Sequence, residues 1–172
     1  MPTASASRTI AASSQAVWGV VGDPHHLPRW WPRVTRVEGV TLTDTGDSGA
    51  FTEVLIGRKG KVVRADFTVV ESLPGLRVVF SQEVEGTPFE GVLRSAVTQI
   101  ELTPVADAGD SGTAVRIELS QEMPALLGGG GGLLGVRVHG IARFGSPLVK
   151  RAAMATVEQA LDGLARVFGD IT

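Results

Sequence analysis

The feature that most constrains the fold is a run of β-branched segments from Val34 to Met123, interrupted by turn residues. Alternation is cleanest near its end, where Val115, Ile117 and Leu119 fall on one face and charged residues fall on the other. This pattern is typical of an antiparallel meander with one apolar and one solvated face. We predict six strands here, at 34–43, 50–57, 61–71, 76–85, 89–102 and 113–123.

Few helical segments are available to cover that apolar face. A short strand near the start precedes a helix that Ser13 or Ser14 caps, and a second helical corner begins at Asp23-Pro24. Ser146-Pro147 begins the final helix, at 146–168, whose apolar residues recur at helical spacing. We therefore predict an α+β fold in which a curved antiparallel sheet of seven strands wraps around the long C-terminal helix, with two short helices after the first strand.

The first half of the final helix carries small side chains. Ala152, Ala153, Ala155 and Ala160 lack the bulk that a strongly curved sheet needs to fill its concave face, which favours an enclosed cavity. Close packing of the helix on the sheet is the alternative, because alanine serves it equally well. The residues alone leave both arrangements open.

Composition limits the classes of function. A chain of 172 residues, 43% hydrophobic and 20% charged, fits a single globular domain over 1–172. Its net charge of -2 lacks the surplus of Lys and Arg that binds phosphates, so we expect no nucleic acid as partner. Cysteine is absent, which excludes disulfides, thiolate metal sites and a cysteine nucleophile. We expect no cofactor.

Two segments are expected to lie outside the packed domain. Residues 1–7 have no apolar stretch after a basic head, so they do not match a signal peptide, and we expect a flexible N-terminus and a cytoplasmic protein. No stretch approaches the roughly 20 apolar residues of a membrane span. A glycine-rich flap is expected at about 125–145, around the five glycines at 128–132. Membrane contact through this flap is a less favoured interpretation.

Several polar motifs have simple structural explanations. Gly-Asp-Ser-Gly occurs at 46–49 and 109–112 and resembles a protease nucleophile loop, but both copies fall where hairpin turns are expected. His25 and His26 are neighbours that point apart in a helix, so we predict no metal site. We assign no catalytic residue.

Polar residues within the predicted strands are assigned to the solvent face. An Arg64 or Arg94 that pointed inward would instead bind a carboxylate or enolate oxygen through its guanidinium group, and would need a carboxylate nearby. The residues concerned are Glu53, Arg64, Asp66, Glu90, Arg94 and Gln99.

Specific segments resemble a known family. Ala-Ser-Ser-Gln-Ala-Val-Trp at 12–18, the stretch 23–27 and Pro-Arg-Trp-Trp-Pro-Arg-Val at 28–34 are similar to the opening of the START-like (SRPBCC, helix-grip) superfamily, especially its polyketide cyclase/dehydrase and lipid-transport branch. Thr-Gln-Ile-Glu-Leu-Thr-Pro at 98–104, followed by 112–117, is similar to the penultimate hairpin of that branch. The resemblance covers nearly the whole chain. It implies a ligand cavity between helix and sheet, and it supplies no substrate.

The combined interpretation is a protein that binds or transports a small hydrophobic molecule, lipid-like or aromatic. The alternatives are a polyketide aromatase/cyclase or dehydrase that uses the same cavity, and a protein-interaction module without a ligand. An enzyme needs an inward acid/base pair, whereas a carrier needs an apolar lining and a gate. The sequence leaves the ligand and the oligomeric state open. We predict that the ligand contacts Trp30, Trp31, Arg94, Val115, Ile117, Leu119, Met123, Met154, Val157 and Leu161.

Overall fold

The computed structural model describes most of the chain. It covers residues 3–42, 49–57, 60–91, 93–105, 112–123 and 141–169, and the side chains of 141–149 are outside this description. Residues 125–140 of the predicted flap therefore lie outside the described residues. The first residues of both Gly-Asp-Ser-Gly motifs also lie outside them.

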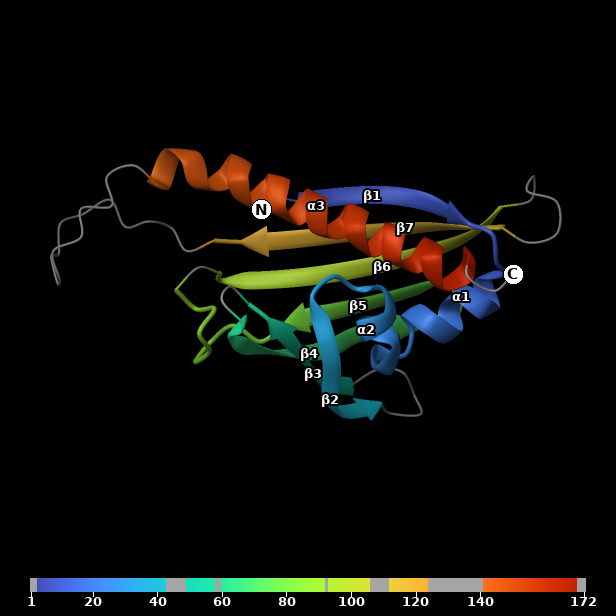
Figure 1. Cartoon of the computed structure of the whole chain (residues 1–172), viewed down its shortest axis with the longest axis horizontal. Coiled ribbons are helices and arrows are strands. Elements are labelled where there is room, and N and C mark those ends of the chain that lie inside the picture. Colours follow the sequence, from blue (N-terminus) through green and yellow to red (C-terminus); the bar gives the residue numbers. More distant parts are fainter. Residues whose placement is uncertain are drawn as a thin grey trace, which may run out of the picture.

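Seven strands form one antiparallel sheet in the order β1-β7-β6-β5-β4-β3-β2. The first strand pairs with the last, and the other strands follow each other as a meander that ends at β2 (Figure 1). This arrangement confirms the predicted α+β class and the predicted sheet. The strands are β1 (Thr3–Ile10), β2 (Val34–Leu42), β3 (Gly49–Ile56), β4 (Val62–Leu73), β5 (Arg77–Gln82), β6 (Ser95–Val105) and β7 (Gly112–Glu122).

The helices lie at one end of the sheet and along one face. Between β1 and β2 the chain forms α1 (Ser14–Val21), a 3-10 turn (Pro24–His26) and α2 (Leu27–Trp30). The Ser13 hydroxyl accepts a hydrogen bond from the backbone N–H of Ala16 at 3.2 Å, so Ser13 is the cap of α1. The long helix α3 (Ile141–Gly169) lies along the sheet beside β1 and β7 (Figure 1).

Three predicted boundaries are wrong. Residues 3–7 are not a flexible terminus, because β1 pairs with β7 from Thr3 opposite Ser120 onward. The final helix begins at Ile141 and not at Ser146. The predicted strand at 89–102 begins only at Ser95. Turns precede it, in which Gly86 has a φ of 71° and the N–H of Leu93 donates to the carbonyl of Phe89.

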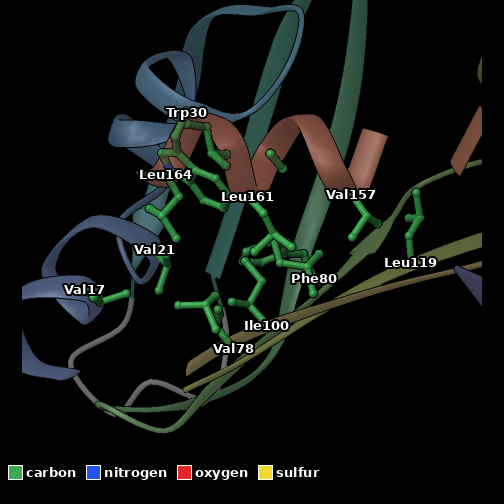
Figure 2. Close-up of a cluster of buried hydrophobic side chains, with 14 of the residues drawn as sticks. Val17, Val21, Trp30, Val78, Phe80, Ile100, Leu119, Val157, Leu161 and Leu164 are labelled. Carbon is green, nitrogen blue, oxygen red and sulfur yellow. The ribbon is translucent and has the colours of Figure 1, made fainter. Parts of the chain in front are cut away.

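The hydrophobic core fills the space between α3, α1, α2 and the middle of the sheet (Figure 2). Leu164 and Ile100 are fully buried there, and Leu161 is 3% exposed. A Cβ added at Gly163 would overlap the carbonyl oxygen of Trp30, so a glycine lets α3 approach α2 closely. We call this region the closed end. Leu119 lies at the opposite end of the cluster from Val17.

Candidate functional site

A cavity of about 170 Å³ lies beyond the closed end, between the sheet and α3. Leu119 belongs to the core and also lines the cavity, so the two regions are continuous. The wall combines aromatic and aliphatic side chains with a few polar ones. It is made of Trp31, Glu53, Leu55, Ala65, Phe67, Gln82, Phe89, Ala96, Thr98, Leu119, Gln121 and Thr156.

Strand alternation places the wall residues. On β3, Phe51, Glu53 and Leu55 are spaced two apart and therefore share one face of the sheet. Glu53 is paired with Ala65 on β4, and Thr98 on β6 is paired with Leu119 on β7, which continues the wall across the sheet. Thr156 of α3 closes the opposite side, so the cavity is bounded by both layers.

Aromatic rings define two sides of the cavity. The rings of Phe51 and Phe67 are stacked with centroids 5.2 Å apart, and Phe80 meets Phe51 edge-on at 5.5 Å. Phe51 is 2% exposed, so this cluster forms a firm support behind Phe67. Trp31 follows α2 and contacts Trp30 edge-on, which presents a second flat apolar surface to the cavity.

Glu53 is the unusual member of the wall. Its side chain is buried, with 6% of the residue exposed, and burial raises its pKa to about 8. Within the described part of the chain, no hydrogen bond or ion pair reaches its carboxyl group, and the two carboxyl oxygens are not completely enclosed. Because this pKa lies above 7, the carboxyl group is mostly protonated at neutral pH and can donate a hydrogen bond.

The sequence assigned Glu53 to the solvent face, and this assignment is wrong. The inward face of β3 carries Phe51, Glu53 and Leu55. The outward face is also largely apolar, with Ala50, Val54 and Ile56. Both faces of this strand thus look apolar in sequence, so alternation could not tell them apart. The one available signal was the position of Glu53 between Phe51 and Leu55.

The other polar strand residues lie at the surface, as expected. Arg64 contacts Glu38 at 3.3 Å, and the Thr52 hydroxyl donates to Asp66 at 2.5 Å. Gln99 accepts a hydrogen bond from Arg77 at 2.9 Å, and Glu90 is exposed. These contacts keep the charged groups of β2 and β4 on the face opposite the cavity.

The structure separates the predicted ligand contacts into several places. Trp31 and Leu119 line the cavity. Met154 and Met123 are half-buried outside the described cavity wall. Arg94 is exposed and borders a hollow of about 330 Å³ formed with Glu85 and Glu90. The remaining five are buried members of the hydrophobic core: Trp30, Val115, Ile117, Val157 and Leu161.

A larger groove of about 420 Å³ lies beside α2 and the second half of α3. Its walls include Arg29, Arg33 and Arg166 together with Asp162, which pairs with Arg8 at 2.5 Å. Trp31 borders both this groove and the cavity. The cavity remains the candidate site, because it alone of the two lies on the inner face of the sheet and contains a buried ionisable group.

Metal-binding and membrane-spanning features are not found within the described residues. No group of three or more His, Asp or Glu side chains is arranged to hold a metal ion in that part of the chain. No described helix is long and apolar enough to cross a membrane.

Comparisons of the fold point to START-like proteins. A START superfamily protein from Mycobacterium smegmatis superimposes with a TM-score of 0.71 at 15% identity, over 99% of both chains. A protein from Thermus thermophilus gives 0.68 at 22% identity, over 99% of this chain and all of its own. An aromatase/cyclase from a Streptomyces species gives 0.65 at 16% identity, over 95% of this chain and 93% of its own. At these identities the likeness shows the fold alone.

Sequence comparison identifies the family. A search of curated proteins gives no significant match to this chain. The profile of one family, however, matches residues 1–169, which is almost the whole chain and includes every strand and helix described above. The resemblance found in the opening segments and the fold comparisons agree with that match. The chain therefore belongs to the polyketide cyclase / dehydrase and lipid transport family.

Proposed function

We propose that this protein binds a small, mostly apolar molecule in the cavity between the sheet and α3. The observation that carries the proposal is the 170 Å³ of space beside Trp31, Phe67 and Leu119 that side chains leave unfilled. Protein interiors are normally close-packed, and apolar cavities of about 150 Å³ take up a benzene-sized guest. Burial of apolar ligand surface at about 25 cal/mol per Å² supplies the affinity.

The size of the cavity restricts the ligand. Pockets for drug-sized molecules measure about 300–1,000 Å³, whereas this cavity holds about 170 Å³. One ring or a short acyl chain fits this space, and any longer part of a ligand would extend beyond it. The bound part of the ligand is therefore a single ring or its equivalent.

The runner-up is an aromatase/cyclase or dehydrase that uses the same cavity. The observation that favours it is Glu53, since a buried carboxyl group with a raised pKa is a candidate general acid. Among the described wall residues, however, Glu53 is the one ionisable group, so the acid/base pair that such a reaction needs is missing from that wall. Ligand binding needs no acid/base pair, so it is the function that the described wall residues support better than catalysis.

The test is a titration of the purified protein with ethylbenzene by calorimetry. We expect saturable binding by the unaltered chain, and binding weakened at least about tenfold in Ala65→Leu, whose larger side chain enters the cavity. Ala50→Leu is the matched control, because Ala50 is exposed on the outer face of β3. Thermal unfolding checks that both variants fold.

Absence of ethylbenzene binding by the unaltered chain contradicts the proposal. Equal binding by the folded Ala65→Leu variant also contradicts it, since the guest would then occupy another place. Native mass spectrometry after incubation with a lipid extract and with aromatic polyketides then identifies the natural ligand class. A docking role without a ligand predicts that neither experiment retains a small molecule.

A further inference from the structure

The polar groups of the cavity come from four different strands. Glu53 lies on β3, Gln82 on β5, Thr98 on β6 and Gln121 on β7, and all four side chains line the same space. Three of them are uncharged donors and acceptors. Among the described wall residues no Lys, Arg or His accompanies Glu53, so nothing in that wall offers a positive charge to a ligand.

The charged groups near Glu53 are directed elsewhere. Glu53 is paired with Val37 on β2 and with Ala65 on β4, and both of these residues are uncharged. Charged residues next to these two positions have partners at the surface: Glu38 pairs with Arg64, and Asp66 accepts a hydrogen bond from the Thr52 hydroxyl. From α3, the wall receives Thr156, which is uncharged. Burial is the cause of the raised pKa of Glu53, and no charged partner contributes to it.

We infer that the cavity selects an uncharged ligand that presents a hydrogen-bond acceptor, such as a ketone or ester carbonyl oxygen, to the carboxyl group of Glu53. The inference rests on the proposed function and names the ligand class for the same site. A protonated carboxyl group that lines the cavity and has no partner among the described residues gains a hydrogen bond from such an oxygen. Glu53 is then satisfied and no charge is buried.

Charged ligands fit this wall less well. A carboxylate or phosphate group would be buried without a cation among the described wall residues, and desolvation of an unpaired anion is expensive. An ammonium group would first require Glu53 to ionise, and both charges would then be desolvated together. Fatty-acid anions and phosphate head groups are therefore excluded from direct contact with Glu53.

The test compares four probes of one size by calorimetry at pH 6.5: ethylbenzene, acetophenone, benzoate and benzylamine. We expect acetophenone to bind about threefold to tenfold more tightly than ethylbenzene, which is the effect of one net hydrogen bond. Benzoate and benzylamine should bind at least about tenfold more weakly than acetophenone. At pH 9.5, where Glu53 is ionised, the preference for acetophenone over ethylbenzene should disappear.

Glu53→Gln is the matched variant, because glutamine keeps the shape and a donor but does not ionise. In this variant we expect the preference for acetophenone to persist at both pH values, while ethylbenzene binds as in the unaltered chain. The probe ranking and its pH dependence in the unaltered protein test the inference even if the variant does not fold.

The outcomes separate the two proposals. Equal affinity for ethylbenzene and acetophenone, independent of pH, overturns this inference and leaves the binding function standing. Tightest binding of benzoate or of benzylamine also overturns it, because a cation or an ionised Glu53 would then contact the ligand. Failure of all four probes to bind contradicts the binding function, and this inference falls with it.

Discussion

The two ends of the space between sheet and helix differ in how they are filled. At the closed end, Leu164 and Ile100 are fully buried and α3 touches the backbone of α2 through Gly163. At the other end, the same sheet and the same helix leave about 170 Å³, and Glu53 lines this space without a hydrogen-bond or ion-pair partner in the described chain. The contrast indicates that close packing at one end contributes stability, whereas the other end leaves space unfilled.

The largest expected effect is at the closed end. Leu164→Ala should lower the free energy of unfolding by about 4 kcal/mol, because it leaves a cavity among fully buried neighbours. Leu119→Ala, at the border of the existing cavity, should lower it by about 2 kcal/mol, since that site is less completely enclosed. Urea denaturation measures both values. Equal losses would mean that the two ends are packed alike.

Glu53→Gln should change how stability depends on pH. The folded pKa of about 8 lies above the ordinary value of 4.5, so between these values the folded state holds a proton that the unfolded state has released. The free energy of unfolding therefore falls as pH rises from about 4.5 to about 8 and is level above that range. The variant lacks this fall, and we expect it to be more stable than the unaltered chain by about 4–5 kcal/mol at pH 9.

The two proteins should be about equally stable at pH 4, where Glu53 is protonated in both states. Denaturation curves collected from pH 4 to pH 9 measure the difference. Parallel pH profiles of the two proteins would show that the carboxyl group is solvated in the folded state. The cavity end would then not differ from the closed end by a carboxyl group with a raised pKa.

Gly163→Ala tests the close approach of α3 and α2. The added methyl group would overlap the Trp30 carbonyl oxygen, so we expect a loss of about 2 kcal/mol in thermal or urea unfolding. Gly19→Ala in α1 is the matched control, because its Cβ would meet no atom within 4 Å. The control should gain up to about 1 kcal/mol from helix propensity. Similar changes at both positions would contradict the close approach.

Thr156→Val should have the smallest effect. Thr156 faces the cavity, and its hydroxyl donates to the Ala152 carbonyl of its own helix at 3.0 Å. The substitution removes a hydroxyl from a place that is not tightly packed, so the change in unfolding free energy should stay below about 0.5 kcal/mol. A loss above about 1 kcal/mol, measured by urea denaturation, would mean that this part of α3 is core.

Local patterns predicted the elements well where one face of a strand is clearly polar. On β7, Arg116 and Glu118 alternate with Val115 and Ile117, so its inward face was identified correctly. A serine cap at position 13 or 14 was also predicted, and Ser13 is the cap, because capping depends on neighbouring residues alone. The start of β1 at Thr3 was missed, since it depends on pairing with β7, more than a hundred residues away.

The candidate site was harder to predict than the fold. The sequence favoured apolar residues of β7 and α3 as ligand contacts, and in the structure Val115, Ile117, Val157 and Leu161 belong to the hydrophobic core. Which apolar residues pack against each other and which border a cavity depends on where α2 and α3 are placed over the sheet. No local pattern records that placement.

By itself, the sequence determined the antiparallel meander, the short capped helix and the final amphipathic helix, because periodicity, caps and turn residues act over a few positions. Only the tertiary structure decided which end of the concave face is filled and which face of β3 is buried. Those properties arise from contacts between residues far apart in the chain, and the burial of Glu53 is the clearest case.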